Sequence, residues 1–181
     1  MSKEKQREFM ALYEPIHDGF VRFCSAKSFG VIDTEDLVQE TIAITFEKLE
    51  KVRDKKAILG FMMSVANNLV NSQLRRKKFK GECSDQAMHK LEALTQSPEL
   101  ALDIAFLYRQ MQKLPKKAQD ALLLYEISGF SIKEIAESQN SSESAVKVRL
   151  MRARKKLTEL CEEKSGKSLH QQLQTLSLFL I

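Results

Sequence analysis

The chain has 181 residues and a formal net charge of +5, from 29 Lys and Arg against 24 Asp and Glu. This length suits one ordinary domain or two small ones and excludes a large multidomain enzyme. Hydrophobic residues make up 43% and charged residues 29%, with only 6 Gly and 3 Pro, so the composition predicts a folded, helix-rich chain rather than a disordered one.

The cysteines and the apolar segments exclude further classes. Cys24, Cys83 and Cys161 lie far apart and form no Cys-x-x-Cys or Cys/His cluster, so we expect reduced thiols, with neither a disulfide framework nor a zinc site. No apolar run approaches the roughly 20 residues of a membrane span, and the N-terminus lacks the apolar core of a signal peptide. We therefore expect a soluble, cytoplasmic protein without membrane insertion.

Periodic apolar residues predict two helical stretches before residue 50. From Glu8 to Ser28 they recur at intervals of three and four, and Pro15 predicts a kink or a break into two short helices. The next helix begins near Asp33, because the helix dipole favours acids in a first turn. Its apolar positions are Leu37, Ile44 and Leu49. Residues 31–50 hold six acids and one base, so this helix presents an acidic face.

A third predicted helix, from Lys56 to Lys80, ends in a strongly basic segment. Its apolar stripe is Ile58, Phe61, Met62, Val65, Leu69 and Leu74. Five of the six residues from 75 to 80 are Lys or Arg, and Asn, Ser and Gln precede them on the same helix. Amides that read exposed base edges, beside cations that hold a phosphate backbone, suit single-stranded nucleic acid. A solvated polar surface is the alternative interpretation.

Residues 81–97 lack periodicity and are interpreted as a linker to a second helical block. Helices are predicted over 98–113, 115–127, 131–138 and 142–163. The last two, with Gln139-Asn140-Ser141 between them, form a helix-turn-helix pattern. Ala136 is small where the two helices cross, and Asn140 occupies the turn position that needs a left-handed backbone.

The last helix of this pattern has an apolar side and a basic side. Its predicted buried stripe is Val146, Leu150, Ala153 and Leu157, and the opposite face carries Ser144, Val148, Met151, Arg152 and Lys155. Residues 142–157 hold six bases and one acid. Such a helix lets side chains reach base edges in the major groove while flanking cations hold phosphates. The pattern predicts duplex DNA binding, with a solvated basic helix as the alternative.

Two segments together resemble bacterial sigma factors of the sigma-70 family, in the compact extracytoplasmic-function (ECF) subgroup. The first is Asp33-Thr34-Glu35-Asp36-Leu37-Val38-Gln39-Glu40, followed by 61–69 and the basic residues 75–78; the second runs from Leu114-Pro115 through Gly129-Phe130-Ser131 to the helix 145–157. The resemblance covers about residues 8–160. It implies an all-α fold of two small helical domains, 1–80 and 98–165, joined by the linker 81–97. The second is a four-helix domain with the helix-turn-helix, and an amphipathic extension, 166–181, follows it.

The resemblance also implies a function and roles for individual residues. It implies a non-enzymatic factor without cofactor, metal or small-molecule substrate, which binds core RNA polymerase and promoter DNA. The residues implied to contact the β′ coiled coil of the polymerase are Asp33, Asp36, Leu37, Gln39 and Glu40. The resemblance also implies a contact with the β subunit. Recognition and melting of the minus-10 element fall on Asn67, Asn68, Asn71, Arg75 and Arg76. The minus-35 element falls to Ser144, Lys147, Val148, Arg149, Met151, Arg152, Arg154 and Lys155.

The chain departs from the family pattern at four positions. The family usually has Trp, Asp, Gly and often Ser where this chain has Phe61, Ser72, Asn140 and Val148. Promoter sequence therefore does not transfer, since Val148 favours a thymine methyl over a hydrogen bond. The alternative function is an ordinary helix-turn-helix regulator that binds its operator without polymerase. A nuclease has little support, because the three histidines stand alone and the carboxylates form no metal constellation.

Two expectations concern control of the protein. Factors of this subgroup commonly hide their DNA-binding surfaces by interdomain packing or with a separate anti-sigma protein, and we expect one of these here. In the extension 166–181, apolar residues recur at heptad-like spacing: Leu169, Leu173, Leu176, Phe179 and Leu180. We interpret it as a helix that covers the second domain, with a docking helix or an intramolecular latch as the alternative.

Overall fold

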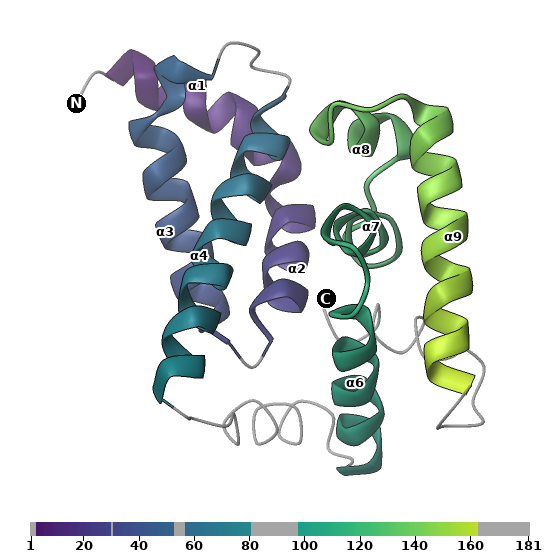
Figure 1. Ribbon diagram of the computed structural model, residues 1–181. Coiled ribbons are helices and arrows are strands. Elements are labelled where there is room, and N and C mark those ends of the chain that lie inside the picture. The colour runs from purple at the N-terminus through teal and green to yellow at the C-terminus, as the bar shows by residue number, and fades with distance from the viewer. Residues whose placement is uncertain (1–2, 30, 53–56, 81–97, 163–181) are drawn as a thin grey trace.

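The computed structural model describes residues 3–29, 31–52, 57–80 and 98–162, and every regular element in these ranges is helical (Figure 1). This confirms the predicted all-α fold. The first helical group comprises α1 (Lys3–Tyr13), η1 (Glu14–Ile16), α2 (His17–Ser28), α3 (Thr34–Glu47), η2 (Leu49–Lys51) and α4 (Ile58–Lys80). The second helical group comprises α6 (Pro98–Met111), α7 (Lys116–Leu122), η4 (Leu123–Ile127), α8 (Ile132–Ser138) and α9 (Glu143–Glu162). The predicted linker, the extension 166–181 and Cys83 lie outside the described residues.

Local capping signals set several helix boundaries. The Asp33 carboxylate accepts a hydrogen bond from the backbone N–H of Glu35 at 2.9 Å and so caps α3. Ser131 and Glu134 form a capping box at the start of α8. Pro15 lies in η1, so the predicted break is a 3-10 turn between α1 and α2. Asn140 has φ of 47°, which confirms the left-handed turn of the helix-turn-helix.

Three details differ from the predicted helices. The buried face of α3 carries Leu37, Thr41 and Thr45, and Ile44, which periodicity favoured, is only half-buried. The Thr45 hydroxyl donates to the Thr41 carbonyl at 2.7 Å, whereas the buried Thr41 hydroxyl has no hydrogen-bond partner among the described residues. Leu74 is 43% exposed because it lines a cavity between the helical groups instead of the core. The helix predicted over 115–127 changes from α7 to the π-helix η4 at Leu123.

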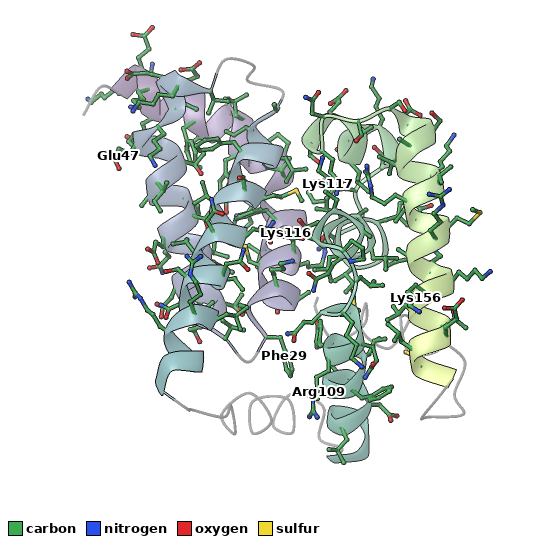
Figure 2. All side chains as sticks on the ribbon, viewed as in Figure 1. Phe29, Glu47, Arg109, Lys116, Lys117 and Lys156 are labelled. Atoms are coloured by element: carbon green, nitrogen blue, oxygen red, sulfur yellow. The ribbon has the colours of Figure 1, made fainter. Side chains whose placement is uncertain are left out.

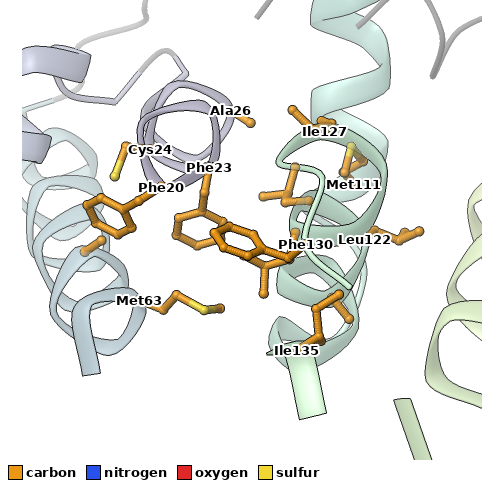
Figure 3. Packing of buried hydrophobic residues seen from close by; sticks show 14 of the residues in the cluster. Phe20, Phe23, Cys24, Ala26, Met63, Met111, Leu122, Ile127, Phe130 and Ile135 are labelled. Atoms are coloured by element: carbon orange, nitrogen blue, oxygen red, sulfur yellow. The ribbon is translucent and has the colours of Figure 1, made fainter. Parts of the chain in front are cut away.

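The two helical groups pack directly against each other. In Figure 1, α7 lies between α2 of the first group and α9 of the second. The buried hydrophobic residues of both groups form one continuous cluster, and Figure 3 shows Phe130 of the second group facing Phe23 of α2. The chain therefore has a shared core in addition to the packing within each group.

Two glycines allow this close approach. A Cβ on Gly19 would lie 2.6 Å from the ring of Phe130, and a Cβ on Gly60 would lie 2.3 Å from the backbone oxygen of Ser138. Both distances are shorter than van der Waals contact permits. A side chain at Gly60 would meet backbone and force α4 away from the second group, whereas one at Gly19 would displace the Phe130 ring from its position.

The turn that follows η4 places Phe130 against α2. The Ser128 N–H donates to the Leu123 carbonyl at 2.9 Å, which closes the wide π-turn. Gly129 then adopts φ of 76°, a left-handed conformation that favours glycine. The Arg22 guanidinium of α2 donates to the Ser128 carbonyl at 3.1 Å. The turn between η4 and α8 is thus held by its own backbone and by the first group.

We expect Gly60→Ala to separate the two helical groups while helical content is retained. The added Cβ meets a backbone atom, so the contact is lost or strained by about 1–3 kcal/mol. Small-angle scattering should give a larger radius of gyration, with an unchanged far-UV circular dichroism spectrum. Ser64→Ala, at an exposed position of the same helix, is the matched control. An unaltered radius and thermal midpoint for Gly60→Ala would contradict this account of the interface.

Candidate nucleic-acid and polymerase-binding surfaces

Helix α9 has the predicted division into a buried stripe and an exposed face. Val146, Leu150, Ala153 and Leu157 are at most 3% exposed. On the opposite side Val148 is 42% and Met151 61% exposed, and Ser144, Arg152 and Lys155 are also exposed. Exposed apolar side chains among cations suit contact with thymine methyl groups in a major groove.

Helices α7 and α9 border an open groove of about 700 Å³ on this face. Its charged lining residues, as far as the structure describes them, are all basic: Lys117, Arg149, Arg152 and Lys156. Between them lie small or apolar side chains such as Ala118 and Val148. A groove lined by cationic and apolar residues favours an anionic partner with apolar parts, as DNA is.

The basic residues of α9 divide into two kinds. Arg149 donates to the side chains of Gln139 and Ser141, so it secures the turn before α9. Arg154 pairs with the Glu126 carboxylate at 2.6 Å and lies 5.2 Å from the ring centre of Tyr125. By contrast, three predicted DNA-binding residues, Lys147, Arg152 and Lys155, form no hydrogen bond or ion pair with another described side chain, and all three are exposed.

Helix α3 presents an acidic face on the first group. Asp36, Gln39 and Glu40 are exposed along one side of the helix. Leu37 is 0% exposed, and the Asp33 side chain caps the helix. Of the five residues predicted to bind polymerase, three are therefore exposed on α3. Of the other two, Leu37 packs α3 onto the core and Asp33 caps its N-terminus.

Helix α4 carries the predicted minus-10 residues, and one of them is covered. Asn68, Asn71, Arg75 and Arg76 are exposed, whereas Asn67 is 3% exposed. The Asn67 amide donates to the carboxylate of Asp120, on α7, at 3.0 Å. The second helical group thus occupies part of the surface that the sequence assigns to DNA.

Asp120 belongs to a small buried network that joins the two groups. Its other carboxylate oxygen accepts from the Lys27 ammonium at 2.8 Å, and Lys27 also donates to the Gln119 amide oxygen at 2.6 Å. The two charged side chains are only 9% and 8% exposed. Burial lowers the pKa of Lys27, and the adjacent Asp120 opposes this shift. Sequence reasoning missed both residues, because nothing in a sequence distinguishes these charges from solvated ones.

The described residues contain no cluster of three or more His, Cys, Asp or Glu side chains suited to a metal. His17 lies 2.8 Å from the Tyr13 hydroxyl and packs on its ring, and burial raises the pKa of Cys24 and Cys161. Within the ranges described, no helix combines the length and apolar character that crossing a bilayer requires.

Comparison with known proteins matches both helical groups to one family. A family model for Sigma-70 region 2 matches residues 12–80, and one for Sigma-70 region 4 matches residues 107–157. The ECF RNA polymerase sigma factor SigM of Bacillus subtilis is 30% identical over 151 residues, covering 82% of this chain and 92% of its own. The ECF RNA polymerase sigma factor EcfG of Rhodopseudomonas palustris is 26% identical over 126 residues, or 70% of each chain.

A solved structure shares the fold. CnrH in complex with the cytosolic domain of CnrY superimposes with a TM-score of 0.55 at 21% identity, over 88% of this chain and 91% of CnrH. An all-α molecule with a region 2 helical group, a region 4 helix-turn-helix and a basic recognition helix is an RNA polymerase sigma factor. The chain belongs to the sigma-70 family, in its ECF subgroup. The ordinary helix-turn-helix regulator is not favoured, because it leaves the region 2 match unexplained.

Arg152→Ala and Arg154→Ala should have separable effects. Arg152→Ala should weaken duplex binding and, if the side chain contacts phosphate, reduce the salt slope by about 1, with the thermal midpoint unchanged. Arg154→Ala should cost about 1 kcal/mol of stability, a loss of about 2–4 °C, because it breaks the pair with Glu126. Fluorescence anisotropy at several salt concentrations and thermal denaturation measure both. Equal destabilisation by the two substitutions would contradict this division of the basic residues.

Proposed function

We propose that this sigma factor binds core RNA polymerase through α3, captures the minus-10 element with α4 and reads the minus-35 element with α9. The observation that carries the proposal is the separation of charge over these three surfaces. The exposed face of α3 is acidic, whereas the exposed Arg75 and Arg76 of α4 and the charged residues of the groove beside α9 are basic. The protein then acts in the cytoplasm as a non-enzymatic specificity subunit that needs no cofactor.

The polymerase contact follows from the exposed part of α3. Asp36, Gln39 and Glu40 offer two carboxylates and an amide to a basic, polar partner such as the β′ coiled coil. Charges at an exposed interface mainly raise the association rate and fix orientation. Leu37 contributes by holding α3 on the core of the first group, since it is 0% exposed.

The two DNA contacts use different chemistry. On α9, Val148 and Met151 offer apolar contact with thymine methyls, and Arg152 is placed to bond a guanine edge or a phosphate. On α4, Asn68 and Asn71 suit unpaired base edges, with Arg75 and Arg76 on the strand backbone. One helical group then reads duplex DNA, and the other stabilises the melted strand.

Run-off transcription with purified core polymerase and a promoter selected from genomic fragments tests this assignment. Initiation should depend on the protein and should fail with Asp36→Arg, through lost core binding, and with Arg152→Ala, through lost minus-35 binding. Glu35→Arg is the matched control, because it reverses a neighbouring exposed acid in the same first turn. If the protein bound specific duplex DNA but neither bound core nor supported initiation, the ordinary regulator would replace the proposal.

The arrangement in the structure corresponds to a closed form with an incomplete minus-10 surface. The Asp120 carboxylate occupies the Asn67 amide, so a base can use this donor only after the helical groups separate. The acidic face of α3 and the recognition face of α9 are exposed in the same arrangement. Closure therefore restricts the minus-10 step while the polymerase and minus-35 surfaces stay accessible.

A protein partner is the second expected means of control. CnrH, whose fold this chain shares, was solved in complex with the cytosolic domain of CnrY. By analogy, we propose an anti-sigma protein that binds this chain and stabilises the closed form. The interface between the groups already brings the two DNA-binding units together, so such a partner needs only to prevent their separation.

A double-substitution cycle at Lys27 and Asp120 tests the closed form. Lys27→Met or Asp120→Asn alone leaves one buried charge without its partner, which costs about 3–5 kcal/mol, so either should open the protein. The double variant removes both charges and keeps an amide acceptor for Asn67, so it should close again. Scattering measures opening, and binding of single-stranded minus-10 DNA should increase only in the single variants. Single variants that stayed compact, or a double variant that stayed open, would contradict the closed form.

A further inference from the structure

A cavity of about 320 Å³ lies at the boundary between the two helical groups. Its walls come from α2, Val31 and α4 on one side and from α6, Leu114, α7 and η4 on the other. The volume falls within the range of about 300–1,000 Å³ that is typical of small-ligand sites. Neither helical group alone forms this cavity.

The cavity is lined by both apolar and polar residues. Val31, Val70, Leu114 and Leu123 supply apolar surface and are each at most 7% exposed. Six lining residues have polar side chains: Tyr108, Asn71, Gln112, Gln119, Lys27 and Lys116. Burial raises the pKa of Tyr108, so its hydroxyl stays protonated and able to donate.

The charges around the cavity do not balance. Among the described residues that line it, two are lysines and none is acidic. The carboxylate of Asp120 neutralises Lys27, whereas Lys116 is exposed and forms no hydrogen bond or ion pair with another described side chain. The positive charge of Lys116 also adds to the burial that lowers the pKa of Lys27. One positive charge at the cavity is left uncompensated, and Figure 2 shows Lys116 where α7 faces the first helical group.

We propose that this cavity binds a small organic monocarboxylate with an apolar body, and that the bound ligand holds the two helical groups together. A single carboxylate matches the single unpaired ammonium group of Lys116, with the amide N–H groups of Asn71 and Gln112 as further donors. The apolar body rests on Val70 and Leu123. A phosphate dianion suits the site less well, because it brings a second charge without a second unpaired cation.

The position of the cavity gives the ligand a regulatory effect, and this part rests on the closed form proposed above. Because both helical groups line the cavity, the ligand binds the closed form and stabilises it by RT ln(1 + [L]/Kd). The bound monocarboxylate ligand would therefore oppose release of Asn67 from Asp120 and reduce promoter opening.

Hexanoate is the probe that tests the site on the full-length protein, with binding followed by isothermal titration calorimetry and by NMR shifts. We expect saturable binding that Lys116→Met weakens about tenfold, as loss of a charge-assisted contact predicts. Lys117→Met, which removes a neighbouring lysine that lines the α9 groove instead, should bind hexanoate normally. Gly60→Ala should bind none, because separation of the groups divides the cavity.

Each other outcome has a defined meaning. Equal binding of hexan-1-ol would overturn the assignment of an anion site, and unchanged binding to Gly60→Ala or Lys116→Met would overturn its location. An absence of saturable binding would overturn the site altogether. If hexanoate binds as expected but does not reduce run-off transcription, the ligand site stands and the closed form fails as a control of initiation. Binding requires the closed form but not transcription, so the scattering measurement on the Lys27 and Asp120 variants distinguishes a failure of the closed form from a failure of the ligand site.

Discussion

The arrangement of the helical groups requires that neither Lys27 nor Asp120 is buried without its charged partner. Burying either charge alone is costly, and each lies on a different group, so both are satisfied only when the groups meet in one register. Asn67 shares the same carboxylate and adds the same requirement. The surrounding apolar cluster supplies attraction without direction. We interpret the polar network as the feature that selects this packing from other ways of joining two apolar faces.

Steric features agree with this electrostatic constraint. Gly19 and Gly60 remove the side chains that would hold α2 and α4 away from the second group. The π-turn at η4 and the left-handed Gly129 place Phe130 against Gly19, and Arg22 secures the same turn from the other side. The two glycines at the contact and the Lys27–Asp120 pair beside it therefore favour the same packing of the two helical groups.

The interface covers the proposed functional surfaces unequally. The acidic face of α3 and the proposed minus-35 face of α9 are exposed, whereas α4 contributes both to the interface and to the predicted minus-10 surface. A contact on α4 can therefore couple domain closure to one step of promoter recognition. The basic residues of α9 are divided in a similar way. Arg149 and Arg154 bond other side chains of the fold, and we propose that Lys147, Arg152 and Lys155 contact a partner.

The sequence by itself determined the all-α fold, most helix boundaries, the helix-turn-helix and the family. The fold, the boundaries and the helix-turn-helix rest on local signals: the acids in the first turn of α3, the left-handed Asn140, and the 3.6-residue spacing that buries Val146, Leu150 and Leu157. The family rests on the resemblance of two segments to sigma-70 sequences. Only the tertiary structure decided that Asn67 is covered, that Lys27 and Asp120 form a buried pair, and that Leu74 lines a cavity. These outcomes come from contacts between residues up to about ninety positions apart, and no local periodicity encodes which distant surface a given face will meet.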